Sequence, residues 1–587
     1  MEYCDQIVNE SYQQMSKSPV QSIPLEQFIL QYVFQFPSFR LYQQKVIQSY
    51  TQGQDVFALI PMGGGKTFCY AASSLIFSEL TVVILPLKAL ILDQVNELIK
   101  VGIPCAGLYA TTGQSLEFQG KVFQEIAAKA IRILLVTPEK LMLNQGLRNM
   151  LRKVHGEIGV RFVIDEAHCI LECNHYRPEW GKLGFLKEFF PSTSILLLTA
   201  TCFQDDVEII CQNLNINSVN FNVIRSSCFS RPEIEYEVKK KSTREKNLIE
   251  ITKIIDKISD GQCIIYCSSP GMCNEILPLL RDKLKETAIG AYHGGLESSE
   301  RDHVMLQWKS QHLKVMIATN AFGLGVNSPN VRSVIHYTFP SSISNFIQES
   351  GRAGRDGNSA QSILFYSRND IKTIYTIITG GRESDFINNE SIERTQYLNK
   401  GQEKIFEMVT YCESIYECRA QQLAAYHSWQ SDSQIPRCTK CDCCKNYFKD
   451  LPKSENIKND VIHLLKVITA VTEFLGMKNQ LTSPLDIVHV FAKANNNNIK
   501  EKQLGSLPIY NQNYNKTLRR FEDILRLLDK LIVKELVKVR VDLKKANTST
   551  SSIQLTCKVI IEGITENAME IAKDVSRNCN IKTQCRM

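Results

Sequence analysis

Three short segments contain side chains that could bind and cleave a nucleoside triphosphate. Residues 60–70 read IPMGGGKTFCY, residues 161–168 read RFVIDEAH, and residues 348–357 read QESGRAGRDG. The first could enclose phosphates, the second could hold Mg²⁺ and polarise a water molecule, and the third could offer arginines to the same phosphates. Their order along the chain predicts a motor that is driven by nucleotide hydrolysis.

The phosphate loop follows an apolar run at residues 56–60, which predicts a buried strand. Its glycines would let the backbone close around phosphate, its lysine would contact the β- and γ-phosphates, and its threonine would contact the metal ion. The loop residues are Gly63, Gly64, Gly65, Lys66 and Thr67. The strict pattern GxxxxGK[ST] has Gly where this chain has Ile60, so a flexible turn with a chance lysine is the alternative for the loop taken alone.

Asp165 and Glu166 follow Arg161 and the apolar residues 162–164, so their carboxylates would lie at the end of an apolar strand, where the ligands of parallel sheets collect. Asp165 suits a magnesium shell, and Glu166 suits the attacking water. An acidic pair of this kind is more often a solvated strand end when it stands alone. Another strand end, LLLTAT at residues 196–201, follows in the order expected of a nucleotide site.

Further segments resemble those of RecQ-family DNA helicases of superfamily 2. They are FRLYQ (39–43), PLKALILDQV (86–95), VTPEKL (136–141), SRPEIEYEV (230–238), IIYCSS (264–269), AYHGGLESSER (291–301) and ATNAFGLGVNSPNVRSVIHY (318–337). The resemblance covers residues 36–366 with few gaps and implies an α/β fold of two RecA-like lobes with ATP between them. Short apolar runs that alternate with amphipathic stretches through both halves agree with this fold.

The resemblance also implies individual roles in the ATP site. Gln43 would bind adenine, Glu166 would act on the catalytic water, and Arg355, supported by Arg352, would be the arginine finger. A guanidinium suits this task because its rigid, charged fork spans phosphate oxygens. A surface cation pair is the alternative for the two arginines. The expected nucleotide-binding set is Arg40, Gln43, Gly63, Gly64, Gly65, Lys66, Thr67 and Asp165.

A second group of residues is expected to contact DNA or to couple DNA binding to the ATP site. They are His168, His175, Tyr176, Arg177, Thr199, Thr201 and Gln348. The family generally has CISQWGHDFRPEY after its DEAH motif, whereas residues 169–180 read CILECNHYRPEW, which is one residue shorter. Cys173 replaces the family's tryptophan and cannot stack on a base. We expect weaker stimulation of ATP turnover by DNA, unless Tyr176 alone suffices.

Four of the 20 cysteines have the spacing of a metal site. Cys438, Cys441 and Cys444 form a C-x2-C-x2-C pattern, and Cys418 precedes them in a helix-like stretch. Four thiolates suit tetrahedral zinc, and the arrangement resembles the RecQ zinc module. Cys443 is then the bystander. Coincidence in a cysteine-rich chain is the alternative.

The segment after the cysteines predicts a winged helix. Apolar residues recur at helical spacing between Leu518 and Ile532, and two strand-like stretches follow at 536–543 and 552–559. Residues 500–545 hold 12 basic and 6 acidic residues, which is most of the chain's net charge of +7. A solvated charged face is the alternative. The turn at 544–552 has no aromatic residue that could separate strands, and ANNNNI at 494–499 predicts a loop.

These expectations give one division of the 587-residue chain. It has an N-terminal arm at 1–35, disordered or in short helices; an ATP-binding lobe at 36–225; a second lobe at 226–385; a zinc module at 386–452; a winged helix at 458–562; and a tail at 563–587.

The function implied by the resemblance is ATP-dependent 3′–5′ DNA unwinding in repair, recombination and replication. ATP, Mg²⁺ and Zn²⁺ would be its cofactors, and single-stranded and duplex DNA, such as forks and junctions, would be bound largely without regard to sequence. The alternatives are a DNA-binding scaffold with a poorly coupled ATPase and an RNA helicase. The sequence does not indicate protein partners. Without a signal-like or membrane-spanning apolar stretch, we expect a soluble intracellular protein, nuclear in a eukaryote and otherwise cytoplasmic.

Overall fold

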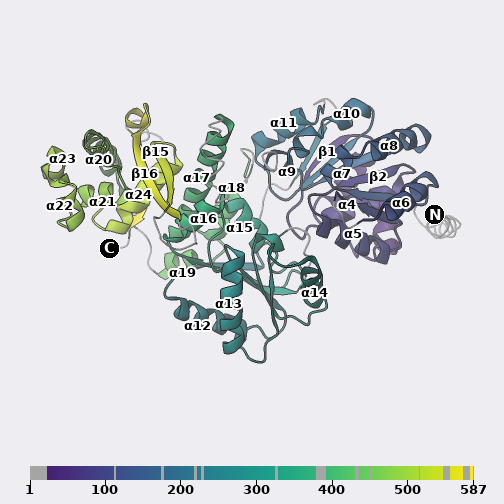
Figure 1. Ribbon diagram of the computed structural model, residues 1–587, viewed down its shortest axis with the longest axis horizontal. Coiled ribbons are helices and arrows are strands. Elements are labelled where there is room, and N and C mark those ends of the chain that lie inside the picture. The colour runs from purple at the N-terminus through teal and green to yellow at the C-terminus, as the bar shows by residue number, and fades with distance from the viewer. Residues whose placement is uncertain are drawn as a thin grey trace.

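Two α/β lobes, a helical module and a C-terminal unit follow one another along the chain (Figure 1). The computed structural model describes residues 23–585, except 111–113, 173–176, 217–220, 226–230, 324–327, 329, 379–391, 427, 430–431, 433–434, 450–452, 515, 546–554 and 573–581. Lobe 1 lies at one end of the long axis in Figure 1, the C-terminal unit lies at the other, and lobe 2 lies between and below them.

Lobe 1 is built on a sheet of seven parallel strands. In spatial order they are β3 (Cys105–Leu108), β4 (Ile133–Val136), β2 (Leu80–Ile84), β5 (Val160–Asp165), β6 (Ile195–Thr199), β1 (Asp55–Leu59) and β7 (Phe221–Arg225). Along β1, Val56 and Ala58 join the core on one face, while Phe57 and Leu59 join the core on the other. A sheet covered on both faces explains why its strands read as continuous apolar runs.

The helices of lobe 1 cover both faces of this sheet (Figure 1). They are α3 (Gln43–Thr51), α4 (Lys66–Ile76), α5 (Lys88–Lys100), α6 (Leu116–Ala127), α7 (Pro138–Leu143), α8 (Gln145–Ile158), α9 (Cys169–Glu172), η2 (Trp180–Lys182), α10 (Phe185–Phe189) and α11 (Gln204–Asn213). The end of the expected N-terminal arm belongs to this lobe. It forms α2 (Leu25–Phe28) and the π-helix η1 (Ile29–Val33), and Ile29 and Leu30 are fully buried in a cluster with Phe68 of α4.

Lobe 2 contains a parallel six-stranded sheet. Its strands in spatial order are β10 (Ile289–Tyr292), β11 (Val315–Ala318), β9 (Gln262–Tyr266), β12 (Val331–His336), β13 (Ala360–Tyr366) and β8 (Ile234–Lys240). Its helices are α12 (Arg244–Asp256), α13 (Pro270–Lys283), α14 (Ser298–Lys309), η4 (Asn320–Phe322) and α15 (Ile343–Ser350). One face packs on α12 and α13, and the other shares a core with α15 and the helical module that follows.

The helical module consists of α16 (Asp370–Ile378), α17 (Ile392–Glu413), α18 (Arg419–Tyr426) and α19 (Asp442–Lys449). Cys418, Cys441 and Cys444 belong to the same hydrophobic cluster as Tyr236 and Phe346 of lobe 2. The module is therefore continuous with lobe 2 rather than tethered beside it. Two short strands, β14 (Lys453–Asn456) and β17 (Lys582–Cys585), pair in antiparallel fashion beyond it.

The C-terminal unit combines helices with an antiparallel hairpin, β15 (Val537–Lys545) and β16 (Leu555–Ile564). The helices are α20 (Lys458–Met477), α21 (Pro484–Ala492), α22 (Asn497–Glu501), η6 (Leu504–Ser506), α23 (Pro508–Asn511) and α24 (Phe521–Val533). The apolar stripe expected at 518–532 is buried except at Phe521, which is 37% exposed. This order of elements suits a winged helix, and that assignment stays a prediction.

The loop expected at residues 494–499 is wrong in part, because α22 begins inside it. The Asn496 side chain accepts a hydrogen bond from the Ile499 backbone N–H at 3.0 Å, and Ile499 is buried. Asparagine is poor inside helices but is a preferred N-cap. The asparagine-rich composition indicated a loop, but the position of Asn496 makes it the N-cap of α22.

The two longest helices that the structure describes, α17 and α20, carry charged residues along their length. Within the described ranges, no helix has both the length and the apolar character that crossing a membrane requires.

Candidate nucleotide site and zinc module

The phosphate loop lies between β1 and α4, where Gly63 and Gly65 take left-handed backbone conformations with φ of 79° and 80°. A Cβ on Gly65 would lie 2.3 Å from Nε2 of Gln43, so a side chain there would displace the Gln43 amide. The Gln43 amide donates to the carbonyl oxygens of Gly64 at 2.9 Å and Gly65 at 3.2 Å, and Arg40 donates to that of Gly63 at 3.0 Å. Arg40 and Gln43 therefore brace the loop, and Thr67 follows in the first turn of α4.

Lys66, Asp165 and Glu166 form a buried charged cluster at the ends of β1 and β5. The Lys66 Nζ lies 2.6 Å from Glu166 Oε1 and 3.6 Å from Asp165 Oδ1. Burial alone would lower the pKa of Lys66, but the two carboxylates raise it overall. Burial would raise the pKa of Glu166, but Lys66 outweighs it and the pKa is lowered. Lysine and glutamate are thus both held in their charged forms.

Asp165 has a second partner that no motif indicated. Gln94 of α5 donates to Asp165 Oδ2 at 3.5 Å, and the Tyr70 hydroxyl of α4 in turn donates to Gln94 Oε1. Burial raises the pKa of Asp165 above its usual value. A carboxylate at a strand end with one amide partner suits a hard cation such as Mg²⁺, which is bound in proteins through one or two carboxylates together with phosphate oxygens. The sequence placed Gln94 in a segment that resembles the family but gave it no role.

Glu166 has a backbone φ of 55°, which is rare for a residue with a side chain. The Glu166 backbone N–H donates a hydrogen bond to Asp165 Oδ1 at 3.0 Å, which helps to hold this conformation. Strained backbone of this kind clusters at functional sites. His168 Nδ1 lies 3.5 Å from Glu166 Oε2 and 2.9 Å from the Thr199 hydroxyl. Thr199 in turn donates to the Thr201 carbonyl at 3.0 Å.

These contacts bring the two expected coupling elements together. The residues after β5 and the end of β6 are joined through His168 and Thr199. These contacts link Glu166 to the segment Thr199–Thr201, called the TAT segment below.

Arg352 and Arg355 follow α15 in lobe 2, and Arg355 packs against the phosphate loop. A Cβ on Gly63 would lie 3.7 Å from Arg355 Cγ. Burial lowers the pKa of Arg355 to about 9, and Arg352 and Arg231 add to the effect by repulsion. Phosphate oxygens would relieve this repulsion. The structure therefore places the expected finger at the nucleotide loop of the other lobe.

Beneath these arginines lies a buried pair that the sequence did not indicate. His336 of β12 is fully buried, and its Nε2 lies 2.9 Å from Glu349 Oε2 of α15. The His336 ring stacks on Tyr266 with a centroid distance of 5.3 Å. A spacing of 13 residues between histidine and glutamate follows no local pattern. The pair ties α15 to the sheet of lobe 2. It thereby also anchors residues 351–355, which follow α15 and are called the arginine turn below.

Of the remaining expected DNA-contacting residues, the structure describes Arg177 of lobe 1 and Gln348 of lobe 2. Arg177 donates from Nε to Glu139 at 2.6 Å and from Nη1 to the Pro86 carbonyl at 2.6 Å, so its guanidinium joins segments of lobe 1. Gln348 lies on α15, half-buried, one turn before Arg352. His175 and Tyr176, like Cys173 of the shortened loop, lie outside the described residues.

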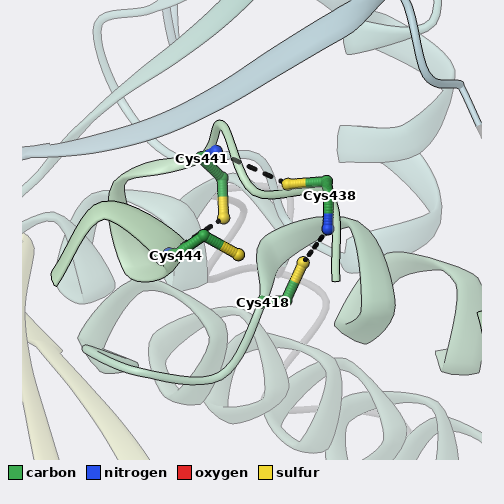
Figure 2. A group of neighbouring side chains, drawn as sticks. All are labelled: Cys418, Cys438, Cys441 and Cys444. Atoms are coloured by element: carbon green, nitrogen blue, oxygen red, sulfur yellow. Dashed lines mark hydrogen bonds between the residues drawn. The ribbon is translucent and has the colours of Figure 1, made fainter. Parts of the chain in front are cut away.

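Four cysteine side chains converge in the helical module (Figure 2). They are Cys418, Cys438, Cys441 and Cys444, and their sulfur atoms all lie within 4.8 Å of one another. Tetrahedral zinc with Zn–S bonds of ~2.3 Å needs sulfur atoms about 3.8 Å apart, so the cluster fits the ion.

Backbone N–H groups support the sulfur atoms. Cys438 donates to Cys418 Sγ at 3.3 Å, Cys441 to Cys438 Sγ at 3.4 Å, and Cys444 to Cys441 Sγ at 3.4 Å. Such donors favour thiolates. Cys443 is the bystander, because its thiol donates to the Ser414 carbonyl at 3.3 Å. The buried Arg419 pairs with Asp442 at 3.0 Å and fixes the start of α18 against α19.

The zinc module also contacts lobe 1. The Trp429 ring lies over the guanidinium of Arg225, whose Cζ is 4.1 Å from the ring centroid. The Nε1 of Trp429 donates to the Cys202 carbonyl at 3.4 Å. Arg225 forms an ion pair with Asp432, and Phe203 packs edge-on against Tyr426. Cys202 directly follows Thr201, so the module reaches the TAT segment. The sequence gave no sign of this contact.

The lobes and the site define a two-lobed P-loop nucleotide-binding protein. Three protein-family descriptions match the chain: DEAD/DEAH box helicase at residues 40–210, helicase conserved C-terminal domain at 245–357, and RecQ zinc-binding at 368–445. The last begins within the range that the sequence assigned to lobe 2.

Curated relatives name the family. The chain is 32% identical over 511 residues to the ATP-dependent DNA helicase RecQ of Pasteurella multocida, covering 86% of this chain and 74% of the relative. It is 33% identical to the ATP-dependent DNA helicase Q-like 4B of Arabidopsis thaliana, covering 89% of this chain and 44% of the relative. It is 33% identical to the RecQ-like DNA helicase BLM of Xenopus laevis, covering 73% and 31%. The chain belongs to the RecQ family of superfamily 2 DNA helicases.

The chain thus spans less than half the length of the Arabidopsis and Xenopus relatives. Among solved structures, the DEAD-box helicase Mss116 bound to ssRNA and UDP-BeF aligns with a TM-score of 0.50 at 20% identity, covering 72% of this chain and 94% of that one. At this identity the likeness concerns the fold of the two lobes alone.

Proposed function

We propose that this protein is an ATP-dependent DNA helicase that translocates 3′ to 5′ on a single strand. One observation carries the proposal: Arg355 of lobe 2 packs against Gly63 of the phosphate loop in lobe 1, on the side where Lys66, Asp165 and Glu166 meet. The site has parts from both lobes. Hydrolysis is therefore coupled to the approach and separation of the two lobes, as a translocating motor requires.

Lys66 would leave Glu166 to contact the β- and γ-phosphates, which frees the Glu166 carboxylate to accept a proton from the attacking water. Arg355, with Arg352 beside it, would stabilise the negative charge that redistributes on the transferred phosphoryl group. Asp165 and Thr67 would hold Mg²⁺, which supplies charge neutralisation on the phosphates. Gln43 and Arg40 would face the base side of the loop. The products are ADP and phosphate.

The path from DNA to this site would run through His168, Thr199 and Thr201. His168 lies between the Glu166 carboxylate and the Thr199 hydroxyl, so a shift of the TAT segment would move the catalytic carboxylate. His175, Tyr176, Arg177 and Gln348 remain proposed participants. The named activities of the RecQ relatives support DNA as the substrate, and the polarity rests on family membership.

We also propose the division into arm, two lobes, zinc module, winged helix and tail with the limits given above. The helix order α20, α21 and α24 followed by the β15–β16 hairpin supports a winged helix. The basic residues of 500–545 would meet the phosphate backbone there, so binding should be sensitive to salt and largely independent of sequence. Forks and junctions are the proposed substrates.

A strand-displacement assay tests the function. Duplexes with a 3′ tail, a 5′ tail or no tail would be compared with and without ATP, next to an RNA duplex of equal length. We expect ATP-dependent release of the 3′-tailed DNA strand only. Release of RNA with equal efficiency would indicate an RNA helicase, and DNA-stimulated turnover without displacement would indicate a scaffold.

A further inference from the structure

Arg231 makes contacts that no motif assigns. It stands directly after residues 226–230, which join β7 of lobe 1 to lobe 2. Its Nη1 donates to the Gly351 carbonyl at 3.0 Å and its Nη2 to the Ala353 carbonyl at 2.8 Å, while its Nε pairs with Glu233. The two carbonyls flank Arg352. One side chain therefore holds both sides of the arginine turn.

The same guanidinium reaches the other lobe. Its Nη1 also donates to the carbonyl oxygen of Met62, in the phosphate loop, at 3.4 Å. Arg231 lines a pocket at the junction of the two lobes and the zinc module, together with Met62, Thr201 and Leu423. The side chain is thus placed where the phosphate loop and the arginine turn meet.

The geometry of the turn explains why it needs a support of this kind. Gly354 has a φ of 62°, and a Cβ there would lie 2.9 Å from the Asn358 carbonyl oxygen and 3.0 Å from Glu233 Cγ. The turn is thus tightly folded, and Arg355 leaves it toward Gly63. Arg352 and Arg231 both repel Arg355, and together with burial they lower its pKa. Like charges would push the turn apart unless its backbone were fixed.

We propose that Arg231 is a positioning residue for the arginine finger. It fixes the carbonyls of Gly351 and Ala353, so that Arg355 is presented to the phosphate loop, and its contact with Met62 makes this presentation depend on lobe approach. A guanidinium is required because only a planar fork with several donors reaches three carbonyls and a carboxylate at once. The inference rests on the proposed function.

Mutants test the proposal by the split between kcat and KM and by a double-mutant cycle. Arg231→Met and Arg231→Lys would be compared with the wild type in DNA-stimulated ATP turnover, and ATP affinity would be followed with a fluorescent nucleotide. We expect both variants to lose about 10- to 100-fold in kcat, since misplacing a catalytic group by about 1 Å has effects of this size. ATP affinity and KM should stay within about 3-fold, as for an interaction made in the transition state.

The cycle separates positioning from general damage. In the Arg355→Ala background, Arg231→Met should lower kcat no further, because it acts through the missing finger. Multiplicative losses in the double variant would overturn the proposal, as would an unchanged kcat in both single variants. Arg231→Lys keeps the charge, so it remains informative if Arg231→Met does not fold. Arg244→Met is the matched control, since the Arg244 side chain is 57% exposed and forms an ion pair with Glu275, away from the arginine turn.

Different results would contradict the proposed function and the role of Arg231. A wild-type protein without ATP turnover would remove the proposed function and this inference with it. If the wild type turns over ATP but the losses of kcat from Arg231→Met and Arg355→Ala multiply in the double variant, only the inference about Arg231 is removed.

Discussion

The Lys66 ammonium lies 2.6 Å from the Glu166 carboxylate, within a cluster that also contains Asp165. The pair joins Lys66, which is expected to contact the β- and γ-phosphates, to Glu166, which is expected to act on the attacking water. Without nucleotide each neutralises the other, so neither is buried as an isolated charge. Nucleotide binding has to separate them, and the γ-phosphate is the group that can replace Glu166 as the partner of Lys66.

Glu166→Gln should abolish turnover while ATP still binds. The amide keeps the shape of the side chain but cannot accept the proton of the attacking water, and a general base contributes about 10²- to 10⁴-fold to a rate. Phosphate release and fluorescent-nucleotide binding measure the two effects. Near-normal turnover would refute the role of Glu166. Lys66→Ala is the contrasting variant, because it should lose nucleotide affinity as well.

Arg355→Ala should retain ATP binding and lose hydrolysis by about 10³-fold or more, the range seen for arginine fingers. Removal of Arg355 also removes part of the repulsion among three arginines. The nucleotide-free variant should therefore melt at the same or a higher temperature than the wild type, whereas its stabilisation by bound nucleotide should be smaller. Differential scanning fluorimetry with and without nucleotide checks this. A lower melting temperature without nucleotide would contradict it.

Zinc should be bound at one ion per chain through Cys418, Cys438, Cys441 and Cys444. Cys441→Ser should lose the metal and much of the soluble protein, because metal binding and folding of such modules are coupled. Cys443→Ser provides the matched control: its sulfur contacts Ser414 rather than the cluster, so the metal should remain. Elemental analysis of both purified variants decides the matter. Zinc retained in Cys441→Ser at full stoichiometry would exclude this site.

Arg225→Ala should loosen the zinc module from lobe 1. The cation–π contact with Trp429 is worth about 0.5–2 kcal/mol, and the ion pair with Asp432 is lost as well. Trp180 and Trp308 are fully buried, so a shift of tryptophan emission to longer wavelength would report Trp429. Arg152→Ala, which removes a similar contact with Phe189 elsewhere in lobe 1, should leave the emission unchanged. An identical spectrum in both variants would show that the contact does not form in solution.

The C-terminal unit should lose stability in acid through His463. Burial lowers the pKa of His463 from 6.5 to about 4, and Lys516, Lys466 and Lys493 add to the effect by repulsion. Between these values the unfolded chain binds the proton and the folded chain does not, so the stability present above pH 6.5 falls as the pH drops toward 4. The loss should reach at most about 3 kcal/mol.

Calorimetry of wild type and His463→Phe over this pH range measures the contribution. Phenylalanine should keep the ring contact with Tyr514, where the centroids lie 4.0 Å apart, but cannot take up a proton. The variant should therefore show a shallower decline in melting temperature as the pH falls. Parallel declines in the two proteins would assign the acid sensitivity to other groups.

The nucleotide site could be predicted from the sequence because its residues lie in short local motifs at the ends of strands. Glu166 directly follows β5, and Lys66 begins α4 after the phosphate loop that follows β1, so the ends of two strands in one parallel sheet bring the two residues together. Arg355 needed more, since its position depends on how two lobes meet, and it was assigned through the family resemblance. Cys418 likewise joined the clustered cysteines because four sulfur ligands were expected.

Residues that act through distant contacts left no local pattern. Gln94 and Arg231 lie in segments that resemble the family, but nothing in those segments indicates which distant partners they contact. Trp429 lies in none of the family-like segments. Trp429 contacts Cys202 across 227 positions of the chain. At residues 494–499 the asparagine-rich composition indicates a loop, whereas the Asn496 side chain caps α22 in the structure.

The contact of Trp429 with Arg225 changes how the two lobes can move. The covalent connection at 226–230 is one point of attachment between them, and the zinc module, which shares a core with lobe 2, supplies another at Arg225 and Cys202. Lobe motions that leave the contacts of Trp429 in place need to break the contacts at the nucleotide site and the Lys309–Asp93 ion pair. Motions in other directions would also have to separate Trp429 from Arg225 and Cys202. The zinc module would therefore bias the direction in which the lobes open, and so the direction of the mechanical stroke.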